Sequence, residues 1–432
     1  MRIRLPKAAI AATIVATSML GAIPAGSALV GPGAPDPRFS GDGITRLKLG
    51  DLTFFSGIAL HGRATVAAGS AQVNGEWDSV LARYTRRGSL DRSFSGDGKV
   101  RIDVGAYDAF NDVVVLPDGK LLAVGSSIGA TRTRFLAMRF HPDGRLDRSF
   151  AKSGVALTAF PDPEAQAFAA LALPSGKVVA CGLTRDLAAD QSGFALARYR
   201  ASGALDATFG GDGKVVTRFP VRSENVCTGL GLASDGQVVA SGFVTSSGPG
   251  TTAAALARYR PNGALEASFD GDGRVEISLG NYTTGEDVLA LPNNFFAIAG
   301  QWQRPGGGYA GYVAKVNTSG HLDMAFGKNG VRSVSVAGGD AKFVGLARAP
   351  GGKLVGVGEW SLNTSPFTQF ALIARLKPGG GLDAGFGAGG IVTMPLAPSG
   401  DSSAAATQVL ADGRIVFSGE TESAGAVARL KG

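Results

Sequence analysis

The sequence predicts an all-β protein: a seven-bladed β-propeller with four antiparallel strands in each blade. Three observations predict it: a phrase that recurs seven times, four strand-like runs in the repeats, and 65 glycines among 432 residues. The phrase reads Leu-Asp-x-x-Phe-x-x-x-Gly in its full copies, and its phenylalanines are Phe39, Phe94, Phe150, Phe209, Phe269, Phe326 and Phe386. Their spacing is 55, 56, 59, 60, 57 and 60 residues. Repeats of this length favour a ring of β-sheet blades over an open solenoid.

The third repeat shows the expected strand order within a blade. Its strand-like runs cover residues 167–173, 177–181, 194–199 and 214–218. Pro174-Ser175-Gly176 separates the first two runs and has the composition of a tight hairpin. The first run is rich in small residues, which suits a crowded axis, whereas the fourth carries charges, which suits a solvent-facing edge. The runs therefore order from axis to rim.

The two ends of the chain fit one incomplete blade. Residues 44–49 form an isolated run of the fourth type, and the chain stops after a run of the third type at residues 426–430. We expect the N-terminal strand to complete the last blade and so close the ring.

Two segments carry a family resemblance. The run from Phe194 to Gly213, which contains one copy of the phrase, and the hairpin run from Leu116 to Gly125 resemble the bacterial delta-60 repeat. The resemblance covers residues 36–432 and implies a β-propeller domain of exported or surface proteins, without known catalytic residues. Two stretches depart from the repeat, Pro292-Asn293-Asn294 and Ala151-Lys152-Ser153. We expect these departures to alter turns and not the fold.

The first 28 residues have the features of a secretory signal. A basic segment with Arg2, Arg4 and Lys7 precedes a short apolar stretch and the small residues of 26–28. We expect cleavage after Ala28, a single propeller domain over residues 29–432, and a protein that is secreted, extracellular or periplasmic and not integral to a membrane. Loss of three positive charges lowers the net charge from +7 to +4, too little for nucleic-acid binding. We expect a monomer.

The chain has two cysteines, Cys181 and Cys227, in neighbouring repeats. Export permits a disulfide between them. Both lie in apolar strand-like runs, where buried free thiols are common. The sequence leaves the bond open and favours free thiols.

Aromatic residues mark one face of the ring as a candidate ligand site. The expected connections between second and third strands vary in length and hold Trp77, Trp302, Tyr309, Trp360 and Phe367. Such rings stack on sugars or anchor protein partners. The alternative, which the sequence favours, is that the rings cap the strand ends.

Acidic residues recur in the expected connections between blades. They are Asp51, Asp108, Glu164, Glu224, the pair Glu286–Asp287, Asp340 and Asp401. A ring of carboxylates would hold a cation or a positively charged ligand, but capping of turns is the better interpretation. The Gly-Asp-Gly steps suggest Ca²⁺ only weakly, because the spacing of ligands in a calcium loop is missing. We expect no metal and no other cofactor.

These features favour a binding scaffold over an enzyme. The expected ligand is a cell-envelope glycan or an extracellular protein, engaged through the variable loops. The alternative is a glycoside hydrolase or lyase that uses two of the carboxylates between blades as acid and base. No Ser-His-Asp or zinc-ligand pattern supports other catalysis.

Overall fold

The computed structural model describes residues 31–246, 251–362, 368–398 and 400–432. The expected signal peptide, residues 1–28, lies outside them. Within these ranges the protein consists of strands joined by turns and two short 3₁₀ segments. None of the described helices is long and apolar enough to cross a lipid bilayer.

The described strands fall into antiparallel units of four, named here by their order along the chain. Unit 1 contains β2 (Leu52–His61), β3 (Ala64–Val73), β4 (Glu76–Tyr84) and β5 (Lys99–Ile102). Unit 2 contains β6 (Tyr107–Val115), β7 (Leu121–Ile128), β8 (Thr133–Phe140) and β9 (Val155–Thr158). Unit 3 contains β10 (Glu164–Ala172), β11 (Val178–Asp186), β12 (Gln191–Tyr199) and β13 (Lys214–Thr217). Unit 4 contains β14 (Glu224–Leu232), β15 (Val238–Thr245), β16 (Thr252–Tyr259) and β17 (Arg274–Ile277).

The remaining units follow the same plan. Unit 5 contains β18 (Thr283–Ala290), β19 (Phe296–Gln303), β20 (Tyr309–Val316) and β21 (Val331–Val334). Unit 6 contains β22 (Gly339–Ala349), β23 (Lys353–Leu362), β24 (Thr368–Leu376) and β25 (Ile391–Met394). Unit 7 contains β26 (Ser402–Val409), β27 (Ile415–Thr421), β28 (Gly425–Leu430) and, from the other end of the chain, β1 (Ile44–Leu47). Units 1 and 2 are joined into one eight-stranded sheet by a single parallel pair, Trp77 with Tyr107.

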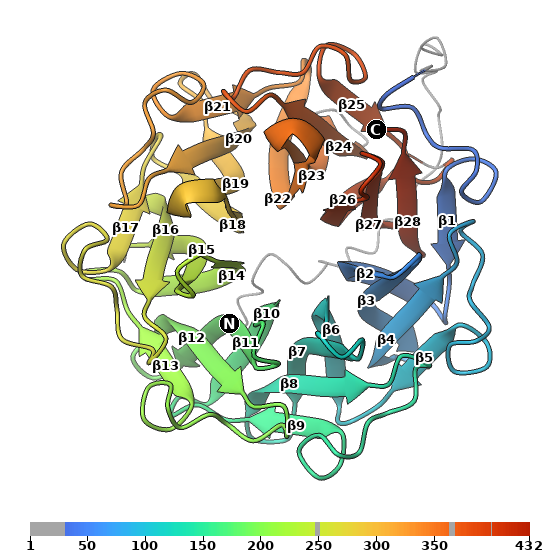
Figure 1. The fold of residues 1–432 in the computed structure, drawn as a ribbon, viewed down its shortest axis with the longest axis vertical. Helices are drawn as coiled ribbons and strands as arrows, with labels where there is room; N and C mark the ends of the chain where they lie inside the picture. Colours follow the sequence, from blue (N-terminus) through green and yellow to red (C-terminus); the bar gives the residue numbers. More distant parts are fainter. Residues whose placement is uncertain (1–30, 247–250, 363–367, 399) are drawn as a thin grey trace.

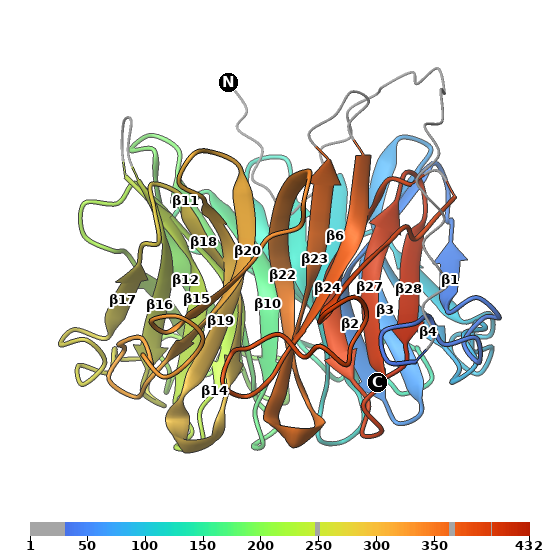
Figure 2. The same ribbon diagram turned by 90° about the horizontal axis from the view of Figure 1, so that it is seen from above.

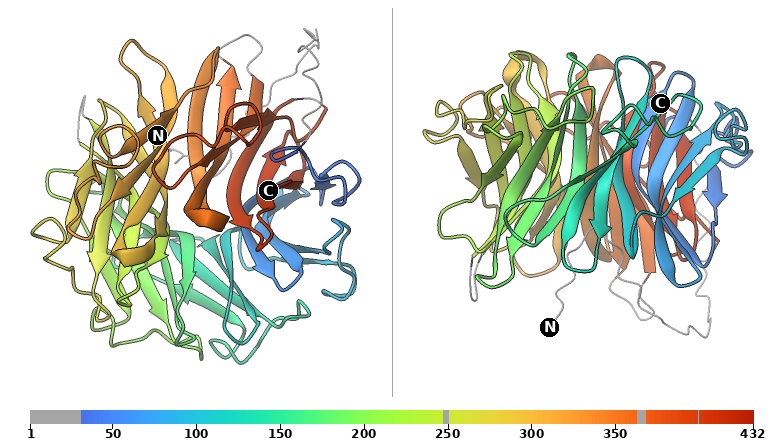
Figure 3. Two further views of the ribbon diagram at one scale, coloured as in Figure 1. Left: turned by 45° about the horizontal axis from the view of Figure 1, so that its top comes forward. Right: turned by 90° about the horizontal axis from the view of Figure 1, so that it is seen from below.

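The units stand around a common axis, with the first strand of each nearest the centre and the fourth at the rim (Figure 1). Seen from the side, the strands run between two faces that carry the turns (Figures 2 and 3). One face carries the hairpins between first and second strands, and we call it the hairpin face. The other carries the hairpins between second and third strands, and we call it the variable face. The predicted all-β repeat architecture is confirmed.

The hydrophobic core lies between neighbouring units. One cluster, for example, joins Val66 and Leu81 of unit 1 to Leu121 and Phe140 of unit 2. The seven phenylalanines of the repeated phrase are each 1% exposed or less, so the phrase fills the gap between sheets as its apolar positions predicted. Arginines of the third strands lie over these rings, as in Arg198 over Phe209 at 4.6 Å.

The first and last units also pack together. β1 pairs antiparallel with β28, and the core between units 7 and 1 joins Phe55 and Tyr84 to Val416 and Val427. The predicted N-terminal strand, residues 44–49, is four residues long in the structure. Chain ends far apart in sequence therefore share one sheet and one core.

A bulge in every first strand explains one column of glycines. At the bulge the backbones of the first and second strands lie close together. A Cβ on the facing glycine of the second strand would lie 1.8–2.1 Å from a carbonyl oxygen of the first strand. These glycines are Gly69, Gly125, Gly182, Gly242, Gly300, Gly358 and Gly419. A side chain cannot be placed there without separating the strands.

Of the two departures from the repeat, the one at residues 292–294 alters its turn, whereas the one at residues 151–153 keeps the backbone of the other repeats. Pro292–Asn294 and Pro350–Gly352 are 3₁₀ segments between first and second strands. Ala151 has a φ of 50°, as Ser40, Ser95 and Asp270 have values of 54–56° at the same place, and Lys152 has a φ of 64° where four other repeats carry glycine. The strands on either side of each departure, β8 with β9 and β18 with β19, keep their antiparallel pairing.

Candidate functional site

The residue after each of these glycines occupies an equivalent place near the variable face. Around the ring these residues are Ser70, Ser126, Leu183, Phe243, Gln301, Glu359 and Glu420. Their cross-strand partners on the innermost strands are Phe54, Ala109, Gln166, Val226, Thr284, Lys342 and Ser403. The backbone repeats here while the chemistry does not, so one part of the ring is apolar and another is charged.

The apolar sector consists of Phe168, Leu183, Val226 and Phe243 in units 3 and 4. They form a separate buried cluster, with each side chain 8% exposed or less. Beside it, Cys181 of β11 and Cys227 of β14 form a disulfide with a Cα–Cα distance of 5.9 Å. The sequence had favoured free thiols. The bond joins neighbouring units, a closeness in space that spacing along the chain does not reveal.

The charged sector consists of Glu286, Lys342, Glu359 and Glu420, from units 5, 6 and 7. Glu286 occupies the bulge of β18, and its Oε1 lies 3.0 Å from Nζ of Lys342 on the neighbouring β22. The two side chains are 3% and 13% exposed. Thr284 donates its hydroxyl to the same Oε1 at 3.1 Å. An ion pair this deeply buried bridges two units close to the axis.

Charge and burial shift the proton affinities in the charged sector. Burial lowers the pKa of Lys342, but the negative charges of Glu286 and Glu359 outweigh it and raise that pKa above its usual range. Burial raises the pKa of Glu359, against the opposing charge of Lys342. The pKa of Glu420 is raised to about 7, chiefly by burial and further by the charge of Glu359. Ser403 donates a hydrogen bond to Glu420 at 3.2 Å, which lowers that pKa in part.

The sequence had placed the tryptophans in loops, but in the structure each of them lies in a strand. Trp77 lies in β4, Trp302 in β19 and Trp360 in β23, and Tyr309 begins β20. Backbone pairing continues past the apolar runs, because ladder hydrogen bonds do not depend on side-chain polarity. In unit 1, for example, the second and third strands are joined by only two residues, at 74–75. Phe367 lies outside the described residues.

The aromatic rings pack against the protein. Trp77 stacks on Phe54 with centroids 5.5 Å apart and tilts against Tyr107 at 5.9 Å. Trp360 lies 5.4 Å from Phe370.

The other two aromatic residues of the predicted ligand site, Trp302 and Tyr309, lie in unit 5. Trp302 donates its Nε1–H to Ser333 at 3.0 Å, and Tyr309 meets Tyr282 edge to face at 5.5 Å. These rings are half-buried, so each presents only part of its surface to a ligand.

The acids expected between units do not form one equivalent ring. Glu164, Glu224 and Asp340 stand four residues before the bulge, Asp108 stands three before it, and Asp51 five before it. Asp401 directly precedes β26 and accepts a hydrogen bond from the Gln369 backbone. Loop lengths differ between repeats, so similar spacing in sequence places these carboxylates at different heights.

Capping explains several of the polar residues at the starts of the first strands. Asp108 is buried and accepts backbone hydrogen bonds from Val104 and Gly105. The residues Thr53, Asn225, Thr283 and Ser402 make the same kind of bond in their units. Asp340 accepts from the Tyr309 backbone at 2.6 Å. A carboxylate is therefore one of several side chains that satisfy this turn.

The Gly-Asp-Gly steps are also turns. Asp42, Asp97, Asp212 and Asp272 each accept the backbone N–H two residues on, at 2.9–3.0 Å. Within the described ranges, no group of three or more His, Cys, Asp or Glu side chains is placed to hold a metal ion.

Sequence reasoning missed Glu359, Glu420 and Lys342. The signal that would have found the two glutamates is their place directly after the glycine that recurs in each second strand. Three of the seven repeats put Ser or Gln there, two put apolar residues, and two put Glu. Glu286 had been noted, but as a member of the acidic ring. Its ion pair with Lys342 depends on contact between units, which no local pattern shows.

Fold and repeats together define a β-propeller repeat protein. Four segments, residues 65–94, 116–150, 173–209 and 233–269, match the family model described as "Domain of unknown function (DUF5122) beta-propeller". These matches support a β-propeller repeat family for the chain. No curated protein matches it.

Several solved structures are similar to the chain at low sequence identity. The WD40 β-propeller domain of Doa1 is 11% identical, with a TM-score of 0.47, over 89% of this chain and 95% of that one. Sqt1 of Chaetomium thermophilum bound to the N-terminus of ribosomal protein L10 is 12% identical, with a TM-score of 0.46, over 90% and 98%. An endo-arabinanase from Bacillus licheniformis is 14% identical, with a TM-score of 0.36, over 63% and 94%.

Proposed function

We propose that the protein is an exported, seven-bladed β-propeller that acts as a binding scaffold. The seven four-strand units are the blades, and pairing of β1 with β28 closes the ring. The signal-like residues 1–28 support export, and the disulfide between Cys181 and Cys227 is compatible with an oxidising compartment. A rigid ring with unequal surface chemistry suits recognition of a ligand.

The charged sector is the observation that carries the proposed binding site. Three adjacent blades place buried or partly buried ionisable groups where the other blades have apolar or neutral side chains. With all four groups ionised, three glutamates and one lysine give a net charge of −2. Perturbed proton affinities of this kind concentrate at functional sites. The site therefore favours a glycan or protein ligand that carries a cationic group, with Glu359 and Glu420 as its acceptors.

The half-buried aromatics extend the proposed site. Trp302 and Tyr309 belong to blade 5 and Trp360 to blade 6, the same blades that supply Glu286 and Glu359. Stacking on their exposed edges would add apolar contact to the charge interaction. Trp77 lies in blade 1, which packs against blade 7 but supplies none of the four charged groups.

Tryptophan fluorescence titration tests the proposal directly. The purified protein is titrated with an amino-bearing oligosaccharide and, separately, with its N-acetylated form, at constant ionic strength. We expect saturable binding of the amino form, weakened about tenfold or more in Glu359→Gln/Glu420→Gln because charge-assisted contacts are lost. Ser126→Ala, at the equivalent place in blade 2, is the matched control. Equal binding by the double variant would refute the charged sector as the site.

A second function, a carbohydrate-active hydrolase or lyase, is favoured by one observation. Glu420 has a pKa of about 7 and stands under the influence of the Glu359 charge, as general acids in carboxylate pairs do. Release of reducing ends or unsaturated sugars from envelope polysaccharides, lost in Glu420→Gln, would establish it. Binding without any turnover would leave the scaffold function alone.

A further inference from the structure

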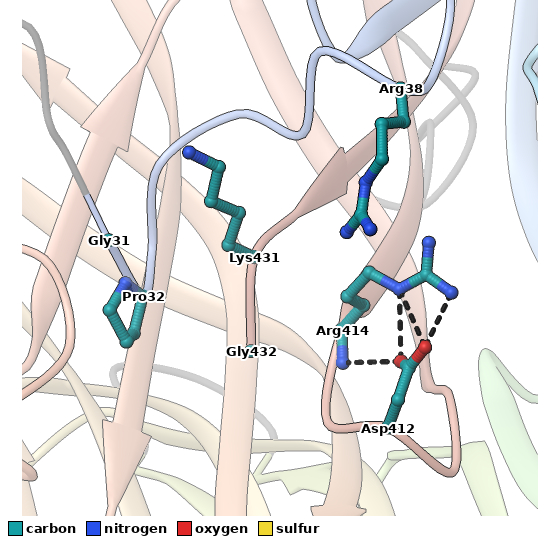
Figure 4. A pocket seen from close by; sticks show the side chains of 7 residues that line it. All are labelled: Gly31, Pro32, Arg38, Asp412, Arg414, Lys431 and Gly432. Atoms are coloured by element: carbon teal, nitrogen blue, oxygen red, sulfur yellow. Dashed lines mark hydrogen bonds and ion pairs between the residues drawn. The ribbon is translucent and has the colours of Figure 1, made fainter.

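A second site lies on the hairpin face, where the two ends of the described chain meet. The segment before β1 runs beside the end of β28. Gly33 donates its backbone N–H to Lys431, Asp36 donates to Arg429, and Lys431 donates to Ala34. A pocket of about 450 Å³ opens at this junction, lined by Pro32, Arg38, Asp412, Arg414 and Lys431 among others (Figure 4). We call it the closure pocket.

Positive charge is in excess around the closure pocket. Three guanidinium groups meet one fully buried carboxylate, Asp36: Arg38 Nε at 3.0 Å, Arg429 Nε at 3.0 Å and Arg414 Nη1 at 3.3 Å. Arg414 also pairs with Asp412 (Figure 4). Lys431 has no ion pair with a described residue. Counting side chains alone, three arginines and one lysine against two aspartates leave a charge of +2.

Proton affinities show the same crowding of cations. Burial raises the pKa of Asp36, but hydrogen bonds from Arg38 and the charge of Arg429 outweigh it and lower that pKa to about 2. Burial lowers the pKa of Arg429, and the neighbouring charges of Arg414 and Arg38 lower it further. Asp36 is thus ionised at neutral pH and already shared, so it cannot neutralise Lys431 as well.

Arg38 is specific to this junction. At the other six copies of the phrase the residue before the phenylalanine is small: Ser93, Ser149, Thr208, Ser268, Ala325 and Gly385. In three of them its hydroxyl bonds to the aspartate of the phrase and to the arginine of the third strand. At the junction an arginine replaces this hydroxyl. Its side chain is 69% exposed while its Nε remains on Asp36, so the guanidinium has donors free toward solvent.

We propose that the closure pocket binds a small oxyanion, the carboxylate or phosphate group of a ligand, through Arg38 and Lys431, which both line it. Guanidinium and ammonium groups are the donors that such anions prefer. Because Arg38 precedes β1 and Lys431 follows β28, a bound anion links the first and last strands of the ring. Binding therefore stabilises the closed ring against separation of its ends.

Calorimetric titration with two probes tests the closure pocket and identifies the anion. Inorganic phosphate and acetate are titrated separately at constant ionic strength, with chloride as the background anion. We expect one probe to bind at one site and to raise the unfolding midpoint. Binding of phosphate points to phosphorylated ligands, and binding of acetate alone points to carboxylates. Failure of both probes to bind overturns the proposal.

Three variants assign the binding to the closure pocket. Arg38→Ser restores the hydroxyl of other repeats and is expected to fold, and Lys431→Gln keeps the backbone pairing with Ala34. Each should weaken anion binding about tenfold or more without lowering the unfolding midpoint in chloride. Lys48→Gln, which removes an exposed lysine from the rim, should leave binding unchanged. Unchanged binding in both pocket variants overturns the proposal, while the glycan titration at the charged sector is unaffected by either result.

Discussion

The apolar and charged sectors occupy equivalent places on the same backbone and use opposite chemistry. Leu183 follows Gly182 in blade 3 as Glu359 follows Gly358 in blade 6, and both stand opposite a bulged first strand. The first packs among apolar side chains, whereas the second faces Lys342. The repeat sets the backbone, and the residue type at equivalent places decides whether a sector packs with apolar side chains or presents charged groups.

The largest test exchanges the two chemistries. Leu183→Glu should destabilise the fold by about 3–5 kcal/mol, because Phe168, Val226 and Phe243 offer the new carboxylate no cation. The reverse exchange, Glu359→Leu, should cost less than about 1 kcal/mol at pH 7, because Lys342 keeps Glu286 as its partner. Urea unfolding measures both. Equal losses would show that the two sectors do not differ as described.

Removal of the disulfide tests how the apolar sector is held together. Cys181→Ala/Cys227→Ala should lower the free energy of unfolding by about 2–4 kcal/mol, since the bond closes a loop with a sequence separation of 46. The natural protein should lose a similar amount under reducing conditions, and the double variant should not respond to the reductant. A natural protein that is indifferent to reduction would contradict a bond between these blades.

Loss of the buried ion pair tests the charged sector. Glu286→Gln should cost about 2 kcal/mol, because Lys342 then keeps only the more distant charge of Glu359. Thermal unfolding at pH 7 measures the loss. Glu276→Gln, at an exposed pair with Arg222, is the control and should cost less than about 1 kcal/mol. A smaller loss in Glu286→Gln than in the control would show that the ion pair does not stabilise the fold.

The smallest effect is expected from a change of pH. The folded protein holds the Glu420 proton more tightly than the unfolded chain, with a pKa of about 7 against 4.5. Ionisation therefore costs the natural protein stability as the pH rises from 4.5 through 7, and below 4.5 the cost vanishes. Glu420→Gln should nearly match the natural protein at pH 4.5 and exceed it at pH 6 by about 1–2 kcal/mol. A constant difference across this range would contradict the shifted pKa.

The repeats determined the sheet architecture because its signals are local. Turn residues, apolar runs and the phenylalanine of each phrase lie within one unit, and in the structure they form the turns, strands and core contacts that the sequence predicted. The prediction that the tryptophans lie in loops was wrong, because the ends of strands are set by backbone pairing, which continues beyond the apolar run. The carboxylates do not form one equivalent ring, because their distances along the chain from the bulge differ. They belong to the acidic residues at 51, 108, 164, 224, 340 and 401.

The sequence by itself determined the repeat, its four strands and the residues that fill the spaces between sheets, because short-range periodicity specifies them. Tertiary structure alone decided which side chains meet across units: Glu286 with Lys342, Cys181 with Cys227, and Asp36 with Arg429. The members of these pairs are separated by tens to hundreds of residues along the chain, and only the packing of one unit against another, or the pairing of β1 with β28, brings them within contact distance. Charge and burial act over a few ångströms, so the chemistry of both proposed sites depends on how the units pack.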